Sequence, residues 1–534
     1  MQKKLKFLIP SFADLFFIIF FIIILSKGGT LLNDGDTGYH IRAGEYIIEN
    51  YSIPKEDIFS YLSPPPKWIA HEWLSEVIMA VIHDLTGLTG IVIFFTTFIS
   101  FSFYIFFKIL NSFFKNLILI WFIIIFVTIC TAIHWLARPH IFSFLFFIIF
   151  YFSLENYENN EKINKLLILP ILMLIWVNLH GGYVIGFILI GVYFVGNVFR
   201  LFSKNNEYLE NNKSKAITYF YLGSACLITS IINPYGLKIL IFPFNLIGEK
   251  FLMSVISEFM PTNMQETLAF KYLFYFSLTI MIGIDYKKNI IEIILFVLFS
   301  YMALYSIRYT TLFAIIVAPM ILKRMEFLID KYNSKKIKKI KNIGENIKNL
   351  DNKSKGYIWP ILTVIFVFFL AKGGQLKYNI NAERHPVDAV KFLLNEKISG
   401  QMFNNDEFGD YLIYAGYPEY KVFFDGRSDM YGTDFVKDFR KVIRLEYGWD
   451  KFIEEKEIGW IFYNSDSALS RMLYERKEWC LIYSDKIADI YVKNVAEYQY
   501  LINKYNGVKP VERLEEMVKR EKGEKKKKLF GWIF

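Results

Sequence analysis

Long apolar runs separated by short polar loops make up the first 371 residues of the chain. Runs of about 20 residues with few charges can cross a hydrocarbon layer about 30 Å thick as helices. We predict eleven spans, each bounded to within about four residues: 7–26, 91–110, 116–133, 141–154, 166–177, one between Gly182 and Arg200, 217–232, 272–284, 290–305, 309–321 and 357–371. The composition agrees, because 54% of the 534 residues are hydrophobic and 19% are aromatic. The pattern predicts a multi-pass α-helical membrane protein.

The polar loops divide into two kinds that alternate along the chain. Loops rich in lysine and arginine fall on one side, and by the positive-inside rule this side, with Lys3, Lys4 and Lys6, is cytoplasmic. The loops that carry histidine and aspartate fall on the outer side. The net charge of +10 therefore reflects orientation in a membrane, and we do not expect nucleic-acid binding. Three cysteines, in positions 130, 226 and 480, make neither a disulfide framework nor a zinc pattern.

From residue 372 onward the composition is that of a soluble domain. QMFNN, KVFFDG, GWIFYN, WCLIYS and ADIYVKN are predicted strands, and PVDAVKFLLNEK and FGDYLIYAG are predicted helices. Strands alternating with helices favour a small α/β domain with a mostly parallel sheet. We therefore predict three parts: a membrane domain at 1–371 with an outer loop at 27–87, an α/β domain at 372–495, and a basic tail at 496–534 suited to adsorption onto anionic lipid. The odd number of spans places the α/β domain outside.

The outer loop holds the first candidates for chemistry. Thr37–Glu49 is predicted as a short amphipathic helix, and Pro64–Pro66 separate it from a second short helix, Trp68–His83. Asp34 and Asp36 could share a divalent cation, or one could act as a base. Simple turn chemistry, with Asp36 as the N-cap, is the alternative. His40 follows Asp36 by four residues and could share its side of the helix.

The remaining candidates lie in other loops on the predicted outer face. His71 and Glu72 lie at the start of the second short helix, and His134, Arg138 and His140 lie within the seven-residue segment HWLARPH. Arginine suits phosphate or carboxylate, although snorkelling to lipid headgroups is the alternative for Arg138 and for Arg308. Asn178 and His180 precede two glycines that let a helix break beside a cavity. Five of the seven histidines and Asn233 and Glu258 fall on this face, which favours one shared outer cavity. In FDGRSDMYG, Asp425, Arg427 and Asp429 form either a ligand loop or an ion-pair network.

The outer loop NDGDTGYHIRAGEYIIENYSIPKEDIFSY resembles the first outer loop of oligosaccharyltransferase catalytic subunits and protein O-mannosyltransferases, which belong to the GT-C superfamily of membrane glycosyltransferases. In that superfamily an acidic residue of this loop is the general base or a metal ligand, which matches Asp34 or Asp36. The chain also resembles a group of bacterial membrane proteins that share ARPHIFSF, WVNLHGG, NPYG and FDGRSDMYG. It departs from oligosaccharyltransferases in carrying ARPH where they have a second acidic motif, and in lacking a WWDYG-like motif, which disfavours asparagine glycosylation.

The resemblance implies transfer of a sugar, hexosyl or pentosyl, from a polyprenyl-phosphate-linked donor at the outer face of a bacterial cytoplasmic membrane. Asp34 or Asp36 would act in catalysis, and His40, His71, Glu72, His134, Arg138, His140, Asn178, His180 and Arg308 would bind substrate or phosphate. No cofactor other than a possible divalent cation is implied, and the acceptor is a lipid, a glycan or a protein. The alternatives are a non-catalytic assembly scaffold and a transporter of lipid-linked intermediates. A transporter is expected to show internal repeats, and the sequence shows none.

Overall fold

The computed structural model describes residues 8–202, 209–282, 289–332, 334–352, 354 and 356–511. Contacts divide the chain into two units. The membrane unit comprises Met1–Leu32, Ala43–Ile53 and Ala70–Asn379. The C-terminal unit comprises Asn33–Arg42, Pro54–Ile69 and Ile380–Phe534. Two pieces of the predicted outer loop therefore fold with residues more than 300 positions later, which no local pattern in the sequence indicated.

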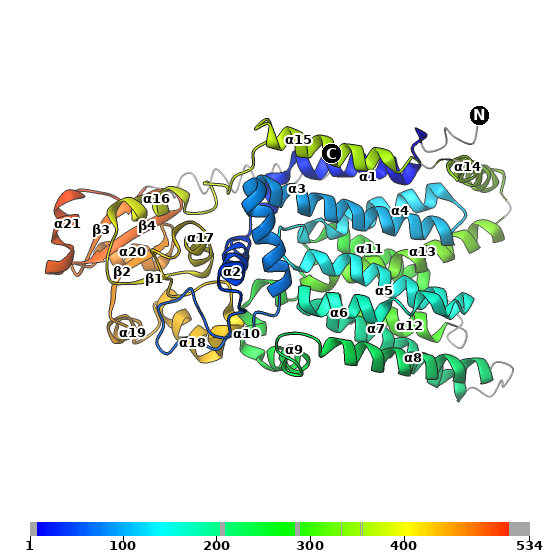
Figure 1. Ribbon diagram of the computed structural model, residues 1–534, viewed down its shortest axis with the longest axis horizontal. Helices are drawn as coiled ribbons and strands as arrows, with labels where there is room; N and C mark the ends of the chain where they lie inside the picture. Colours follow the sequence, from blue (N-terminus) through cyan, green and yellow to red (C-terminus); the bar gives the residue numbers. More distant parts are fainter. Residues whose placement is uncertain are drawn as a thin grey trace. The chain divides into compact units, whose positions relative to one another are not determined.

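Apolar helices occupy all eleven predicted ranges of the membrane unit (Figure 1). They are α1 (Phe12–Ser26), α3 (Trp73–Phe113), α4 (Leu117–Thr131), α5 (His140–Asn160), α6 (Leu169–Leu179), α7 (Val184–Leu201), α8 (Leu209–Ser230), α11 (Leu268–Met281), α12 (Ile290–Tyr305), α13 (Thr310–Lys331) and α15 (Ile358–Lys372). Among the described residues, four stretches are long and apolar enough to cross a membrane by themselves: Trp73–Phe113, Leu117–His134, His140–Asn160 and Gly181–Leu201. The chain is a helical membrane protein, and the count of eleven spans stays a prediction.

The two helices expected in the outer loop have different outcomes. The first is α2 (Asp36–Asn50), close to the predicted range. The second was predicted at Trp68–His83, but the helix begins at Trp73 and continues into the next span as α3. Gly87 adopts a positive φ of 63°, which glycine tolerates without a Cβ penalty, so the axis of α3 bends there without a connecting loop.

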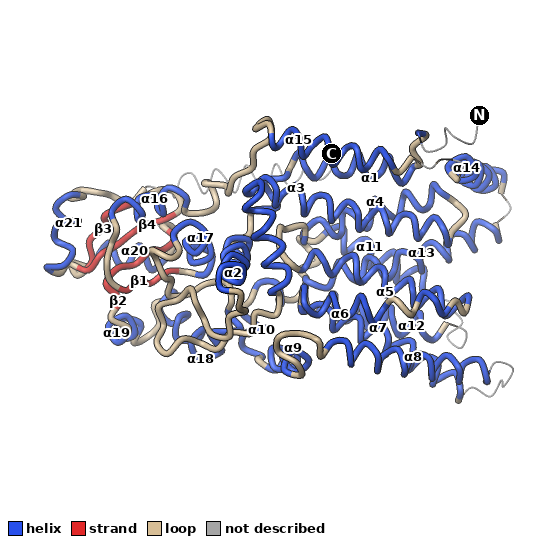
Figure 2. The backbone as a smooth tube through the Cα atoms, viewed as in Figure 1, coloured by secondary structure: helices blue, strands red, loops and turns tan. Residues whose placement is uncertain are grey.

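The C-terminal unit contains a four-stranded sheet of β1 (Gln401–Asn404), β2 (Ile458–Asn464), β3 (Trp479–Ser484) and β4 (Ala488–Lys493), with strand order β1-β2-β4-β3 (Figure 2). Only β1 and β2 pair in parallel, and β4 is antiparallel to both of its neighbours. The prediction of a mostly parallel sheet is wrong. The short turn between β3 and β4 forms a hairpin, which requires antiparallel pairing.

Helices α16 (Val387–Glu396), α17 (Asp406–Gly416), α18 (Ser428–Ile443), α19 (Trp449–Glu455) and α20 (Ala468–Glu475) complete this unit. KVFFDG, predicted as a strand, lies outside the sheet. Its backbone is bound elsewhere: Val422 N–H donates to the Phe59 carbonyl at 3.0 Å, and Phe423 N–H donates to Asn404 Oδ1 at 2.8 Å. A segment of the outer loop and one asparagine side chain thus take the hydrogen bonds that a neighbouring strand would have used.

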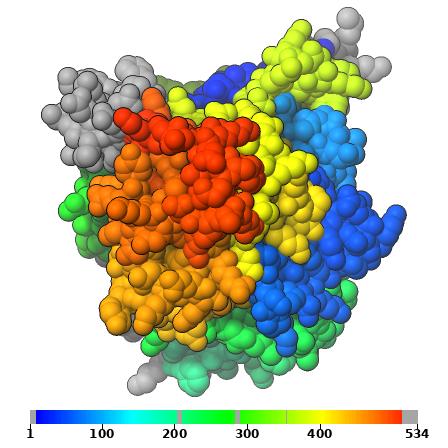
Figure 3. All heavy atoms as spheres, turned by 90° about the vertical axis from the view of Figure 1, so that its left-hand side faces the viewer, coloured from blue at the N-terminus to red at the C-terminus, as the bar shows by residue number. Residues whose placement is uncertain are grey.

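The start of the predicted basic tail belongs to the folded C-terminal unit. A 3₁₀ turn (Ala496–Tyr498) leads into α21 (Gln499–Lys504), and the side chains of Tyr498 and Leu501 are buried. The red end of the described chain forms part of one continuous packed surface with the orange residues before it (Figure 3). Residues 512–534, which include the lysines and aromatic residues expected to adsorb on lipid, lie outside the described residues, as do Lys3, Lys4 and Lys6.

A buried ion-pair network holds the loop 54–69 to the rest of the C-terminal unit. Arg427 is 3% exposed and donates to Asp425 through Nε and Nη2 at 2.8 and 2.7 Å. The same Nη2 donates to Asp57 Oδ1 at 2.7 Å, and Arg427 lies over the Trp68 ring, 4.5 Å from its centroid. Burial alone would raise the pKa of Asp57, but the Arg427 cation and hydrogen bonds from Ser60 and Phe59 outweigh it, so that pKa lies below its usual range. Of the two readings of FDGRSDMYG, Asp425 and Arg427 here fit the ion-pair network.

We predict that Asp57→Ala destabilises the C-terminal unit by about 1.5–3 kcal/mol, because it removes the charge-assisted hydrogen bond from Arg427 and the acceptor for the buried N–H groups of Phe59 and Ser60, although Arg427 keeps Asp425 as its partner. The matched control is Asp388→Ala, which breaks the exposed Lys391–Asp388 pair (2.8 Å) and should cost less than about 1 kcal/mol. Denaturant unfolding of the purified protein, monitored by tryptophan fluorescence, measures both. Equal effects of the two substitutions would contradict the role given to Asp57.

Candidate functional site

The predicted polar loops of the membrane unit meet at one end of its helices. The loop 132–139 joins α4 to α5, residues 180–183 join α6 to α7, and a 3₁₀ turn (Ile307–Tyr309) joins α12 to α13. The segment 258–262 is attached to this last turn, since Ile307 N–H donates to the Met260 carbonyl at 3.0 Å and Ser306 Oγ donates to the Glu258 carbonyl at 2.8 Å. The segment 258–262 and the turn that carries Arg308 are therefore fixed to each other by hydrogen bonds.

The Glu258 carboxylate lies between two arginines. Arg138 Nη1 forms a short ion pair with Glu258 Oε1, and Arg308 Nη1 lies 3.6 Å from Glu258 Oε2. These cations, Arg138 first, hold the pKa of Glu258 well below its usual range, so the carboxylate stays charged. The Arg308 side chain is 31% exposed and its guanidinium lies over the Phe259 ring, 5.5 Å from the centroid. The structure thus places both predicted phosphate-binding arginines on one carboxylate.

His180 is held in one protonation state by its surroundings. The Gly182 N–H donates to His180 Nδ1 at 2.9 Å, and a backbone N–H can only donate. Ser143 Oγ also lies 2.7 Å from this Nδ1, and Ser143 accepts from Trp176 Nε1 at 2.7 Å, which leaves its hydroxyl proton for His180. Nδ1 is therefore an acceptor. Burial and the nearby Arg308 cation hold the pKa of His180 well below its usual range, so the ring is neutral and carries its proton on Nε2.

Gly182 makes this arrangement possible. A Cβ at this position would lie 2.5 Å from Ser143 Oγ and 2.7 Å from His180 Nδ1, closer than real Cβ contacts. The helix break expected at the glycines is present, because α6 ends at Leu179 and His180 has an extended backbone.

The protonated edge of His180 faces two charged groups. Its Nε2 lies 3.1 Å from Arg308 Nη2 and 3.4 Å from Glu72 Oε1, and His71 Nε2 lies 3.7 Å from the same Glu72 oxygen. Because both His180 Nε2 and Arg308 Nη2 are donors, they do not satisfy each other. Two donors converge there, which is what an anion with several acceptor oxygens requires.

His134 and His140 have structural partners in the same region. His134 Nε2 lies 2.9 Å from the Ile307 carbonyl, and His140 Nε2 lies 2.8 Å from the His134 carbonyl. A carbonyl only accepts, so each ring donates through Nε2. His134 therefore binds the loop 132–139 to the turn that carries Arg308, and His140 binds the start of α5 to the same loop.

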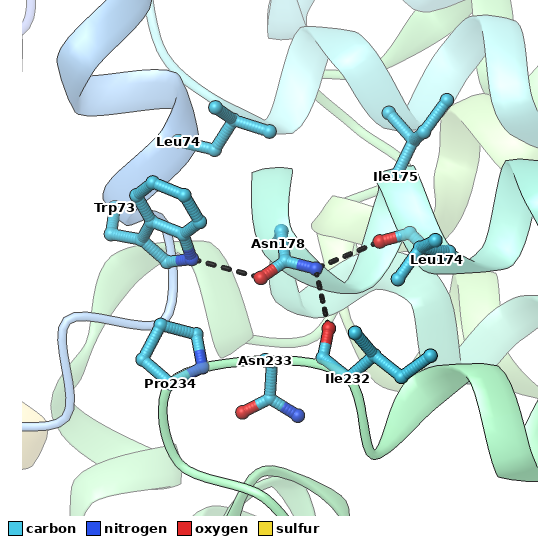
Figure 4. A pocket seen from close by; sticks show the side chains of 8 residues that line it. All are labelled: Trp73, Leu74, Leu174, Ile175, Asn178, Ile232, Asn233 and Pro234. Atoms are coloured by element: carbon cyan, nitrogen blue, oxygen red, sulfur yellow. Dashed lines mark hydrogen bonds between the residues drawn. The ribbon is translucent and has the colours of Figure 1, made fainter.

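Asn178 forms part of a cavity of about 460 Å³ beside this region (Figure 4). Its Oδ1 accepts from Trp73 Nε1 at 2.9 Å, and its Nδ2 donates to the carbonyls of Leu174 and Ile232 at 2.8 and 3.1 Å. Asn178 therefore joins the start of α3, α6 and the chain after α8. The other residues of the cavity wall are mostly apolar: Leu74, Ile175, Asn233 and Pro234. Asn233 itself forms the turn expected of NPYG, because its Oδ1 accepts from Tyr235 N–H at 2.7 Å.

Asp34, Asp36 and His40 belong to the C-terminal unit. Asp34 Oδ1 accepts from Asp36 N–H at 3.0 Å at the start of α2, so Asp34 supplies a turn bond, and the N-cap role of Asp36 stays a prediction. A Cβ on Gly426 would lie 2.3 Å from Asp36 Oδ1 and 2.9 Å from Asp410 Oδ2. The carboxylates of Asp36 and Asp410 therefore flank the same glycine. His40 is buried. The shared cavity for all of the candidates stays a prediction.

Asp410 is a site residue that the sequence did not reveal. It lies on α17, is 2% exposed, and accepts from Gly426 N–H at 2.9 Å through Oδ1. Burial, then the negative charges of Asp36, Asp425 and Asp406, raise its pKa well above the usual range. Within the described residues, no group of three His, Cys, Asp or Glu side chains is arranged to hold a metal ion, and a divalent cation stays a prediction.

Ser143, Trp176 and Glu258 also support the site, and none was among the predicted binding residues. Glu258 was placed on the outer face, but a single carboxylate in a loop carries no signal of its two arginine partners. Ser143 and Trp176 are ordinary residues of apolar helices in the sequence. Their role becomes visible only in the structure, where Trp176 donates to Ser143 and Ser143 contacts His180.

Solved structures with the same fold exist, although no protein family and no curated protein matches the sequence. The archaeal oligosaccharyltransferase AglB from Archaeoglobus fulgidus, in complex with an inhibitory peptide and a dolichol-phosphate, is 10% identical, with a TM-score of 0.51 over 85% of this chain and 70% of that one. The apo form of the Archaeoglobus fulgidus enzyme gives the same identity and TM-score over 89% and 74%. A form tethered to an acceptor peptide with the NVT sequon is 11% identical, with a TM-score of 0.51 over 84% and 69%. The chain thus shares its fold with these archaeal oligosaccharyltransferase structures, in agreement with the resemblance of its outer loop.

We predict that Asp410→Asn stabilises the protein at pH 8 and has little effect near pH 4. A carboxyl whose pKa is raised by folding carries no penalty below the unfolded-state value of about 3.9, and the penalty grows as the pH rises above it. Asparagine keeps an oxygen for Gly426 N–H and removes the charge. Melting temperatures measured from pH 4 to pH 8 should diverge by several degrees toward high pH, whereas the exposed control Asp388→Asn should follow wild type. A constant difference at every pH would contradict the raised pKa.

Proposed function

We propose that this protein is a membrane glycosyltransferase that moves a hexosyl or pentosyl unit from a polyprenyl-phosphate-linked donor to an acceptor at the outer face of a bacterial cytoplasmic membrane. The observation that carries the proposal is the pair of donors at Arg308 and His180, on a fold shared with oligosaccharyltransferases. Dolichol-phosphate, present in one AglB structure, is a polyprenyl phosphate, which supports this donor class. The acceptor is a lipid, a glycan or a protein.

The membrane unit supplies the phosphate site in this proposal. Arg308 Nη2 and His180 Nε2 donate to phosphate oxygens, and Arg138 adds a second cation held in place by Glu258. Glu72 lies beside the Nε2 edge of His180 and His71 lies beside Glu72, so these two residues orient that edge. In the reaction the bond from the sugar anomeric carbon to the phosphate oxygen breaks, and the polyprenyl phosphate leaves with the electron pair. The fixed donors stabilise this developing negative charge without reorganising, which is the largest contribution in many enzymes.

The DGD segment supplies the base in this proposal. The new bond forms between the anomeric carbon and an acceptor hydroxyl, whose proton passes to Asp36 or Asp34. Asp34 Oδ1 accepts from the Asp36 N–H, and the Asp36 carboxylate lies beside Gly426 and Asp410. Either carboxylate is a candidate for the base. His40, His134, His140 and Asn178 stay predicted binding residues, and the contacts of the last three support positioning of the site.

We predict that Arg308→Ala weakens binding of a polyprenyl phosphate to the purified protein in nanodiscs by at least about tenfold, since a hydrogen bond to a charged group contributes about 1.5–3 kcal/mol. The matched control is Arg324→Ala. Arg308 precedes the first residue of α13, whereas Arg324 lies in the second half of this helix and pairs with Glu292 at 2.9 Å. Saturable binding that is equal in wild type and Arg308→Ala would remove this phosphate site from the proposal.

We predict that Asp36→Asn lowers sugar transfer by at least about a hundredfold, the contribution of a general base, while polyprenyl-phosphate binding changes less than twofold. Transfer from a radiolabelled polyprenyl-phosphate sugar to an acceptor pool measures the first quantity. Asp34→Asn is the matched variant, since asparagine retains an oxygen for the Asp36 N–H. If both variants transfer sugar at the wild-type rate, the base is neither residue. If none of the three proteins transfers sugar although the donor binds, the assembly-scaffold alternative is favoured.

A further inference from the structure

A basic amphipathic helix crosses the end of the membrane unit that lies opposite the His180 site. This helix, α14 (Lys335–Asp351), falls in a segment that the sequence showed only as a lysine-rich loop. Figure 1 shows α14 nearly end-on, whereas α4 and α13 lie lengthwise, so α14 runs across the ends of these helices. It begins with an N-cap, because Ser334 Oγ accepts from Ile337 N–H at 3.3 Å.

One face of α14 is fixed to the membrane unit. Asn116 caps the start of α4, and a Cβ on Gly344 would lie 2.0 Å from its Oδ1. Only glycine therefore permits α14 to cross α4 this closely. Lys348 Nζ makes short hydrogen bonds to the carbonyls of Asn111 and Phe114 at the end of α3. Asp351 Oδ1 accepts from Phe12 N–H at 2.6 Å at the start of α1. The helix is therefore held at the level where three apolar helices begin or end.

The rest of α14 presents two chemically different strips. Positions 340, 343, 347 and 350 recur at helical spacing and form an apolar strip, in which Ile340, Ile343 and Leu350 are 45%, 41% and 64% exposed. Lys335, Lys336, Lys338 and Lys339 are exposed at the first turns, and within the described residues none of the four forms an ion pair. A helix with these two strips, lying across the ends of spans, suits the boundary between headgroups and acyl chains.

We propose that α14 is a binding surface for anionic phospholipid in the leaflet opposite the proposed catalytic face. The apolar strip enters the acyl boundary, and the four lysines contact the phosphate groups. Under the predicted orientation this is the cytoplasmic leaflet, whose negative surface potential attracts basic segments beside spans. Because α14 holds the ends of α1, α3 and α4, lipid bound there would stabilise that end of the bundle. This inference does not depend on the proposed glycosyl transfer.

The test is lipid binding to the full chain in detergent, measured by native mass spectrometry with added phosphatidylglycerol or phosphatidylcholine. The variant Lys335→Gln/Lys336→Gln/Lys338→Gln/Lys339→Gln removes four charges from exposed positions outside the contact with α4. The matched control, Lys391→Gln/Lys437→Gln/Lys441→Gln/Lys456→Gln, removes four exposed charges from the C-terminal unit. We expect the α14 variant to bind phosphatidylglycerol about tenfold more weakly than the control, with phosphatidylcholine binding unchanged and the difference shrinking at high salt.

Equal phosphatidylglycerol affinity of the two variants would overturn the proposal, as would an equal loss of both lipids. A melting temperature of the α14 variant within a degree or two of the control shows that its fold is intact. Polyprenyl-phosphate binding serves as the second readout. It should be unchanged in the α14 variant, and its loss there would overturn the separation of this surface from the catalytic face.

Discussion

The hydrogen bond from the Gly182 N–H to His180 Nδ1 determines what the polar end of the membrane unit can bind. A backbone N–H has no second protonation state, so it places the ring proton on Nε2 whatever the tautomer preference of free imidazole. Trp176 and Ser143 reinforce this choice through a buried chain of hydrogen bonds. The result is a neutral donor beside a cationic one, Arg308. Such a pair repels cations, fails to satisfy itself, and accepts an anion with several oxygens.

The charges around this pair are arranged so that the arginines stay in position without a ligand. Glu258 contacts both Arg138 and Arg308, and its charge is maintained by them. In the proposed phosphate site, an anion bound between Arg308 and His180 would compete with Glu258 for Arg308, while Arg138 would keep Glu258 as its partner.

The buried carboxylates of the C-terminal unit differ in whether a cation lies beside them. Arg427 forms ion pairs with both Asp425 and Asp57, and the side chains of these two aspartates are fully buried. Asp410 has no such cation among its main electrostatic neighbours, which are themselves carboxylates, and its pKa rises accordingly. The carboxyl groups of Asp410, on α17, and of Asp36, on the DGD segment, both lie against Gly426, so the charge of Asp36 is one cause of the raised pKa of Asp410.

Much of the architecture was already determined by the sequence. An apolar run predicts a membrane helix directly, because each backbone polar group of such a helix bonds within its own segment. The helices of the membrane unit lie at the positions of these runs. The same local logic gave α2, β1, β2, β3 and β4. The outer-loop motif resembles that of oligosaccharyltransferases, and the solved oligosaccharyltransferase structures share the fold of this chain at about 10% identity.

The tertiary structure decided which distant residues meet. KVFFDG has the composition of a strand, yet Phe59 and Asn404 take its hydrogen bonds. Asp410 and Ser143 look like ordinary helix residues until Gly426 and His180 are placed beside them. The strand β4 lies between β2 and β3 as the second strand of the β3–β4 hairpin and is antiparallel to both, which alternation of strands and helices does not reveal. Periodicity reports what a residue does within its own element, whereas a site depends on partners separated by hundreds of residues, and only folding selects those partners.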